Sequence, residues 1–351
     1  MKISIIRHSI RNRGGDKIPY EYGQYLAGKG HKIVYWVNEI KTTEPLDERI
    51  EFKKIPWPGK TGTIFFTLLT NFKSDTVLVD LAAMSLFASL RNKKSVIMLA
   101  QDFDVSYYSS KLLQKIVSII YWIIFRVLNT PVIIESESLF NKLKTFKPRR
   151  YIISPIGIDL NFYKRKTDSS SGSKEKSVIL LAVWQDYRKG IDIAKKALIE
   201  LKNIRDQADW EIWTIGEKLD PIDNIKIINH GFLKSEKLKE IFSATDIYLM
   251  PSRSEGLSLL LLTALAMECC VVATEAANII THQTNGLVSP IEDWSKLSFN
   301  LNRALEDKTL RKKLKTEARL LAEQFDVNKS KAHFEQSLYI LTNLKKSKKQ
   351  L

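Results

Sequence analysis

Short apolar runs alternate along the chain with longer segments in which apolar residues recur at helical spacing. Strands that are buried on both faces read as continuous apolar runs, which is typical of parallel sheets covered by helices. The predicted strands lie at 2–6, 32–37, 77–80, 96–99 and 131–134, and then at 178–183, 211–215, 225–228, 246–250 and 271–274. This alternation predicts an α/β protein with two Rossmann-like, doubly wound units facing a cleft.

Segments with helical spacing connect or follow these strands. A first helix is predicted to end near Lys29, with Pro19 in its first turn, where a missing N–H costs little. Further helices are predicted at 191–203, 238–244, 296–306, 310–323 and 328–344. Residues 50–72 contain two prolines and an aromatic cluster, and we expect them to be irregular.

The serine-rich stretch 167–176 is predicted to be a linker. It separates a first domain over 1–166 from a second over 177–327. A chain of 351 residues is long enough for two domains of ordinary size.

The chain is basic, with a formal net charge of +16. Part of this charge is concentrated in the tail 345–349, which is either a solvated terminus or a contact for anionic lipid or substrate. No nucleic-acid-binding motif accompanies the charge, so a nucleic-acid partner is not expected. The two cysteines are neighbours, Cys269 and Cys270, and form no disulfide framework. Because the N-terminus also lacks a signal-peptide pattern, we expect a cytoplasmic location.

The most apolar segment, 116–125, is too short to span a bilayer, which needs about 20 apolar residues. The helix predicted around it, 112–128, has two interpretations. It is either buried in the protein, or it lies in a membrane interface with Tyr121 and Trp122 at headgroup depth. In the second case the protein is peripheral on the inner face of the membrane.

The stretch from 249 to 290 carries the clearest chemistry. A buried strand ends at Pro251-Ser252, Glu255-Gly256 forms a turn, and a helix is predicted to begin near Leu257 or Ser258. A helix start presents backbone N–H groups and a positive dipole end, both of which suit a phosphate. A carboxylate beside it accepts hydrogen bonds from sugar hydroxyls, so the pattern indicates a nucleotide-sugar ligand.

This stretch resembles the donor-binding signature of family-4 glycosyltransferases with the GT-B fold. The matching residues are Pro251, Ser252, Glu255, Gly256, Ala264, Ala266 and the strand 271–274. The sequence departs from the signature at four places: Thr263 replaces its second glutamate, Glu268 a glycine, Cys270 a proline and Ala277-Asn278 a glycine pair. The family's second glutamate holds the ribose, and Thr263 offers only an uncharged hydroxyl there.

The turn 184–190 resembles a second part of the family pattern. Lys189-Gly190 stands where the family has lysine-glycine, which implies contact with the diphosphate. The family's arginine is replaced by Trp184, and Arg188 is predicted to supply the missing charge.

Other segments match the family more loosely. Gly14-Gly15 resembles the glycine pair of its first loop, where the backbone approaches the donor phosphates or the acceptor. Asp102 follows a strand, where it either touches substrate or caps a helix. Gly231 lies either in the nucleotide pocket or in a structural turn, and 155–159 resembles the segment near the interdomain hinge.

The resemblance implies a glycosyltransferase that moves a sugar from a nucleotide-diphosphate donor, with retention, to a glycan or lipid-linked acceptor in cell-surface synthesis. The acceptor is expected on the first domain, and the helix 328–344 is expected to cross back to it. No cofactor or metal is expected. Glu255, Lys189 and Asp102 are the predicted catalytic residues, and the predicted donor-binding residues are Gly14, Gly15, Arg188, Lys189, Gly231, Glu255, Gly256, Leu257, Ser258 and Thr263.

Two alternatives remain. The departures from the signature are also compatible with a degenerate GT-B protein that binds a nucleotide-sugar or a partner transferase without turnover. A basic scaffold on a membrane surface is the other.

Overall fold

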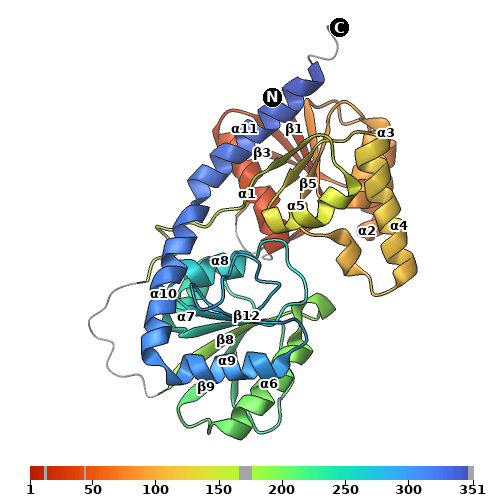
Figure 1. The fold of residues 1–351 in the computed structure, drawn as a ribbon. Helices are drawn as coiled ribbons and strands as arrows, with labels where there is room; N and C mark the ends of the chain where they lie inside the picture. The colour runs from red at the N-terminus through yellow and green to blue at the C-terminus, as the bar shows by residue number, and fades with distance from the viewer. Residues whose placement is uncertain (12–13, 43–44, 166–175, 347–351) are drawn as a thin grey trace. The chain divides into compact units, whose positions relative to one another are not determined.

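The computed structural model describes residues 1–11, 14–42, 45–165 and 176–346, with no account of the side chains of 344–346. The chain divides into two compact units, Met1–Ile156 with Asn328–Leu351, and Gly157–Val327 (Figure 1). The predicted linker lies outside the described residues except for Lys176, and so does the tail from Ser347.

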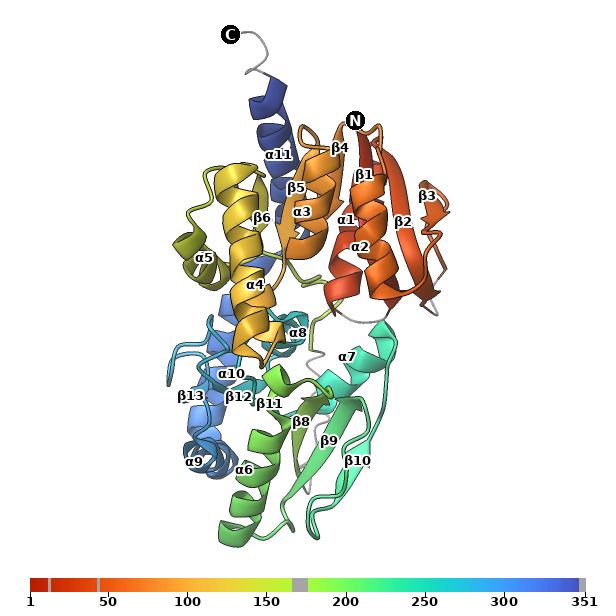
Figure 2. The ribbon, with the colours of Figure 1, turned by 90° about the vertical axis from the view of Figure 1, so that its right-hand side faces the viewer.

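The first unit is built on a parallel sheet in the order β3-β2-β1-β4-β5-β6-β7. Helices α2, α3 and α4 pack on one face, whereas α1 and α11 pack on the other (Figure 2). Its elements are β1 (Lys2–Arg11), α1 (Gly14–Gly28), β2 (Lys32–Lys41), β3 (Ile50–Lys54), α2 (Gly59–Leu69), β4 (Thr76–Val79), α3 (Ala82–Arg91), β5 (Val96–Ala100), the 3-10 turn η1 (Asp104–Tyr107), α4 (Lys111–Trp122), the π-turn η2 (Ile123–Val127), β6 (Val132–Ile134), α5 (Glu137–Leu143), η3 (Lys144–Phe146), β7 (Tyr151–Ile153) and α11 (Val327–Lys346).

The second unit repeats this plan with a parallel sheet in the order β10-β9-β8-β11-β12-β13. Helices α6 and α9 cover one face with a core of aliphatic residues, and α7 packs on the other, where Phe242 meets Tyr248. Its elements are β8 (Ser177–Val183), η4 (Tyr187–Lys189), α6 (Ile191–Ile204), β9 (Trp210–Gly216), β10 (Ile227–Asn229), α7 (Ser235–Ala244), β11 (Ile247–Met250), α8 (Leu259–Ala266), β12 (Cys270–Thr274), β13 (Leu287–Ser289), α9 (Trp294–Glu306), α10 (Lys308–Ala322) and η5 (Glu323–Phe325).

The two parallel sheets confirm the predicted pair of Rossmann-like folds. The prediction for 50–72 was wrong, because this stretch forms β3 and α2 around its two prolines. Helix α2 buries Phe66 against Trp36 and Phe72, so the aromatic cluster is part of a packed layer. The first strand is also longer than predicted and runs to Arg11, and α1 begins at Gly14.

The order in which successive strands are added to the sheet reverses between β8 and β11 in the second unit, and between β1 and β4 in the first. In doubly wound sheets the loops at the carboxyl ends of these central strands form the ligand site. The loops after β8 and β11 contain Lys189 and Glu255 respectively, so both predicted donor motifs flank one switch point.

Two chain segments cross between the units and pair with each other. Ile158 and Asp326 form a parallel bridge, with Ile158 N donating to Phe325 O at 2.7 Å and Val327 N donating to Ile158 O at 3.1 Å. A Cβ on Gly157 would lie 2.6 Å from Val327 Cα, so this close approach requires glycine. After the crossing, α11 packs on the first unit, where Phe334 stacks on Tyr22 with ring centroids 3.8 Å apart.

Candidate functional site

The central contact of the second unit is an ion pair between the loops after β8 and β11. Lys189 Nζ donates to Glu255 Oε1 at 2.7 Å and to Oε2 at 2.9 Å. Ser252 Oγ donates to the same Oε1 at 2.7 Å. The Glu255 side chain is 8% exposed and that of Lys189 is 25% exposed, so the carboxylate is buried while the lysine side chain is partly open to solvent.

Gly190 makes this contact sterically possible. Its φ is +63°, a left-handed conformation, and it forms the N-cap position of α6. A Cβ at this position would lie 2.0 Å from the carbonyl oxygen of Pro251. Only glycine therefore lets the turn that carries Lys189 approach the turn that carries Glu255. The local sequence Lys-Gly thus has a steric meaning as well as a chemical one.

Helix α8 begins at Leu259, close to the predicted start. Ser258 is its N-cap, and the Ser258 hydroxyl accepts a hydrogen bond from Leu261 N at 3.3 Å. The preceding turn is fixed by Asn278, whose Nδ2 donates to Gly256 O at 3.0 Å. Asn278 stands where the sequence signature has a glycine, so the departure supplies a side chain that supports the Glu255-Gly256 turn. Leu257 is buried below this turn.

Thr263 is placed differently from the prediction. Its side chain is buried in α8, and its hydroxyl donates to Leu259 O at 2.8 Å. A threonine hydroxyl bonded to the carbonyl four residues earlier is directed along its own helix. This placement argues against the predicted ribose contact, because residue 263 presents no polar atom at the surface of the unit.

Arg188 pairs within its own turn. Its guanidinium donates to both carboxylate oxygens of Asp186, at 3.1 Å from Nε and 2.6 Å from Nη2. Burial tends to raise the pKa of Asp186, but the hydrogen bonds from Arg188 outweigh it and hold that pKa below its usual value. The charge that Arg188 brings is therefore balanced locally, which weakens the prediction that it replaces the missing family arginine.

Arg253 was not among the residues predicted from the sequence. Its guanidinium donates to both Asp192 carboxylate oxygens at 2.7 Å and to Tyr187 O at 2.9 Å, and it also pairs with Glu292. Its backbone N donates to Arg188 O at 2.6 Å. These contacts join the η4 turn, the start of α6 and the turn after β11. The hydrogen bonds that Arg253 donates to Asp192 and Glu292 raise the pKa of Arg253, so it keeps its charge.

The remaining predicted donor residues are spread over both units. Gly231 follows β10 with a φ of +68° and open space around it, and its carbonyl accepts from Gly216 N at 2.8 Å. Close to it, Trp184 and Phe232 form an edge-to-face pair with centroids 5.5 Å apart. Gly14 and Gly15 are exposed at the start of α1 in the first unit.

Asp102 also lies in the first unit, directly after β5. Its carboxylate accepts from Phe103 N at 2.9 Å and from the Tyr107 hydroxyl at 3.5 Å. The N-cap position of the following turn is Phe103, so Asp102 is not the helix cap that was one of its two predicted roles. Asp104 does cap a helix start, because it accepts from Ala82 N at 2.6 Å.

The family comparison agrees with this geometry. Residues 175–307, which contain Lys189, Glu255 and the whole switch point of the second unit, match the model of the family "Glycosyl transferases group 1". Over these residues the chain is therefore similar to that glycosyltransferase family. An uncharacterized glycosyltransferase of Methanocaldococcus jannaschii, MJ1607, is 24% identical over 170 residues. That match covers 44% of this chain and only 43% of the relative.

Solved structures show the same GT-B fold over nearly the whole chain. Sucrose-phosphate synthase from Thermosynechococcus elongatus superposes with a TM-score of 0.80 at 16% identity, covering 98% of this chain and 100% of that one. WaaG, a glycosyltransferase involved in lipopolysaccharide biosynthesis, gives 0.77 at 17% identity, with coverage of 97% and 99%. Anabaena HepE, solved with UDP and glucose, gives 0.74 at 16% identity with the same coverage.

Substitution of Gly190 by alanine should destabilise the second unit by at least about 2 kcal/mol, because it adds a steric clash to the strain of a left-handed backbone. Gly231→Ala is the matched control, since its φ is also positive but no atom lies within 4 Å of the added Cβ. Urea unfolding of both variants measures the difference. Equal losses would show that Gly190 is required only for its backbone conformation.

Substitution of Arg253 by alanine should loosen the η4 turn and cost about 2 kcal/mol, because a charged fork with several partners is lost. Arg253→Lys should recover less than half of the lost free energy of unfolding, since an ammonium cannot donate to both carboxylate oxygens of Asp192 in the way that a guanidinium does. Arg205→Ala is the control, because the Arg205 side chain, which pairs with Asp209, is 26% exposed whereas that of Arg253 is 10% exposed. If both alanine variants unfold at the same urea concentration, Arg253 does not join the loops.

Proposed function

We propose that this chain transfers a sugar from a nucleotide-diphosphate donor to a hydroxyl group of a glycan or lipid-linked acceptor, with retention at the anomeric carbon. The observation that carries the proposal is the Lys189–Glu255 pair at the switch point of the second unit. An ammonium has three N–H donors, and Lys189 directs two of them to Glu255. The third then suits an oxygen of the leaving diphosphate.

The chemistry of the transfer follows from this arrangement. Breaking the bond between sugar and diphosphate leaves negative charge on the departing phosphate, and the main need is to stabilise that charge. Lys189 supplies a positive charge, and the first turn of α8 supplies backbone N–H groups and a dipole. We therefore propose that no metal is required. Glu255 orients Lys189 and accepts hydrogen bonds from the donor sugar.

The first donor to test is chosen from a solved structure with the same fold. HepE, which shares the fold, was solved with UDP and glucose, so a uridine diphosphate sugar is the first donor to test. A thermal-shift screen with UDP, GDP, dTDP and ADP identifies the nucleotide, since a ligand that binds the folded state raises the melting temperature. Release of the nucleotide diphosphate from the matching nucleotide-sugars then distinguishes an enzyme from a degenerate binding protein. The second candidate is retained because the Thr263 hydroxyl is bonded within its own helix.

Lys189→Ala and Glu255→Gln should each lower transfer at least about tenfold, because each removes one side of the group that stabilises the leaving diphosphate. The double variant should lose less than the product of the two single losses, since the residues act as a pair. Lys226→Ala and Glu240→Gln, two exposed residues of the same unit, are the controls. Assays with and without EDTA test metal independence. Full activity in both single variants would remove this pair from the mechanism.

Helix α4 gives the acceptor proposal a physical basis. Only Val117 and Tyr121 of this helix are buried, so the buried-helix interpretation of this segment was wrong for most of its surface. Its outer face, continued into η2, exposes apolar side chains flanked by Lys111, Lys115 and Arg126. The exposed apolar residues are Leu112, Leu113, Ile116, Ile119, Trp122 and Val127.

We propose that this face binds an anionic membrane surface, where a lipid-linked acceptor is found. The proposed contact is peripheral, because it uses the exposed face of one helix. No helix among the described residues is long and apolar enough to cross a membrane. Apolar side chains would enter the interface while the flanking cations meet lipid phosphates. WaaG, which shares the fold, is involved in lipopolysaccharide biosynthesis, and a role in cell-envelope glycan synthesis is consistent with this surface.

The triple variant Leu112→Ser, Ile116→Ser and Ile119→Ser should lower binding to phosphatidylglycerol vesicles at least about tenfold, because each buried aliphatic side chain contributes about 2 kcal/mol. Phe299→Ser with Leu320→Ser, two exposed apolar residues of the second unit, is the matched control. Vesicle co-sedimentation measures the effect. Equal binding by both variants would mean that α4 is not the membrane contact.

A further inference from the structure

A row of polar side chains crosses the carboxyl edge of the first sheet. In the parallel register Ile6 pairs with Val79 and Ala100 pairs with Ile134. The next residues along these strands are Arg7 beside Asp80, and Gln101 beside Glu135. Arg7 and Asp80 lie at the switch point of this unit, between β1 and β4, which is where doubly wound sheets place their ligand contacts.

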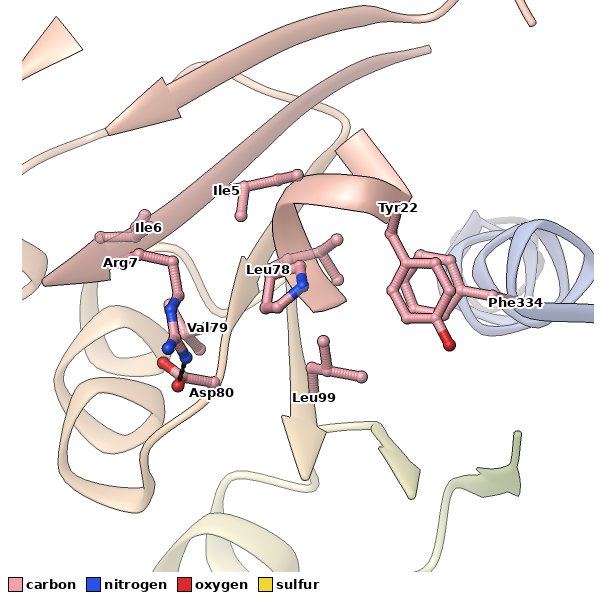
Figure 3. Close-up of a pocket in the computed structure, with 10 residues that line it drawn as sticks. Ile5, Ile6, Arg7, Tyr22, Leu78, Val79, Asp80, Leu99 and Phe334 are labelled. Carbon is pink, nitrogen blue, oxygen red and sulfur yellow. Dashed lines mark ion pairs between the residues drawn. The ribbon is translucent and has the colours of Figure 1, made fainter. Parts of the chain in front are cut away.

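Arg7 is the centre of this row. Its guanidinium donates to Asp16 Oδ1 at 2.5 Å and to Gln101 Oε1 at 3.2 Å, and it pairs directly with Asp80 (Figure 3). The residue is 8% exposed. It lies beside a small cavity that is closed on one side by Tyr22 of α1 and Phe334 of α11.

These contacts connect Arg7 to two segments that the proposed function needs. Asp16 belongs to the first turn of α1 and follows the glycine pair Gly14-Gly15. Gln101 immediately precedes Asp102 at the end of β5. The positions of the glycine pair and of Asp102 therefore depend on the same guanidinium.

Glu135 is the buried group that this network does not neutralise. It is 1% exposed, and within the described residues its Oε1, like Gln101 Nε2, has no partner at hydrogen-bonding distance. Burial raises the pKa of the Glu135 carboxyl to about 8, although the nearby Gln101 amide and the Arg7 charge both act in the opposite direction. Arg7 already faces two carboxylates and does not balance a third.

The neighbours of Glu135 come from three elements. Arg7 faces it from β1, Gln101 and Asp102 from the end of β5, and Tyr22 from α1. The pKa of Tyr22 is raised far above its usual range, chiefly by burial and further by Glu135, so this tyrosine stays neutral. A pKa of about 8 makes Glu135 a group that changes charge close to neutral pH.

We propose that Glu135 is a positioning residue for the acceptor side of the reaction. As a neutral acid, Glu135 leaves the Gln101 side chain bound to Arg7. This contact in turn keeps Asp102 and the start of α1 in place. This proposal rests on the proposed function. When Glu135 loses its proton, a third carboxylate competes for Arg7 and for the Gln101 amide. The hydrogen bonds from Arg7 to Gln101 and Asp16 then weaken, and both segments loosen.

The same proton links pH to stability. A carboxyl whose pKa is higher in the folded state than in the unfolded state binds its proton more tightly when folded. The folded state therefore loses stability as the pH rises from the ordinary glutamate value to about 8, and the loss is complete above that. Glu135→Gln removes this dependence while keeping the shape of the side chain.

The test compares the wild type, Glu135→Gln and the control Glu137→Gln, which changes an exposed glutamate two residues away. Amide hydrogen exchange is measured at pH 7 and pH 9 and corrected for the intrinsic rate. Between these values the neutral fraction of an acid with a pKa of about 8 falls about tenfold. The wild type and Glu137→Gln should lose protection in residues 14–20 and 101–107 by up to that factor, whereas Glu135→Gln should not.

Activity gives a second readout. Once a donor and acceptor are in hand, the wild-type kcat/KM for the acceptor should fall over this pH range, with little change in KM for the donor, and Glu135→Gln should stay flat. Equal alkaline loss of protection in the wild type and Glu135→Gln, or none in the wild type, would overturn the inference even if transfer is observed. Altered exchange without any sugar transfer would overturn the proposed function instead, because hydrogen exchange needs no substrate.

Discussion

The second unit of this molecule depends on one close approach of two backbone turns. The turn after β8 and the turn after β11 meet because residue 190 has no side chain, and the Pro251 carbonyl occupies the space where a Cβ would be. This contact brings Lys189 to within 2.7 Å of the Glu255 carboxylate. The charged pair at the switch point of this parallel sheet can form only because glycine has no Cβ at position 190.

The departures from the family signature acquire a meaning once the contacts are known. Asn278 replaces a glycine and supports the turn that holds Glu255. Arg253 holds the two turns together through backbone and carboxylate contacts. Thr263, in contrast, does not replace the missing carboxylate, because its hydroxyl donates a hydrogen bond to Leu259 O within its own helix. Compared with that signature, the sequence therefore keeps the glutamate at 255 and the lysine at 189 and departs from it at residue 263.

Much of the fold was predictable because both sheets are buried on two faces, so their strands appear as continuous apolar runs such as 178–183 and 246–250. The stretch 50–72 was not, since its prolines suggested an irregular segment while α2 is held by packing of Phe66. Lys189 and Glu255 were selected from local motifs, and the structure brings their side chains together. Arg7, Arg253 and Glu135 were missed, because their roles come from tertiary pairings and burial that no short sequence window records.

The bridge between Ile158 and Asp326 holds the two ends of the second unit side by side. The chain enters and leaves the second unit at neighbouring points, so residues 157–327 are topologically an insertion within the first fold. Adjacent ends are the property that makes domain insertion and circular permutation tolerable. An insertion of this kind can be exchanged as one piece: replacing one contiguous segment replaces the whole second unit, with Lys189 and Glu255, and leaves the sheet of the first unit covalently intact.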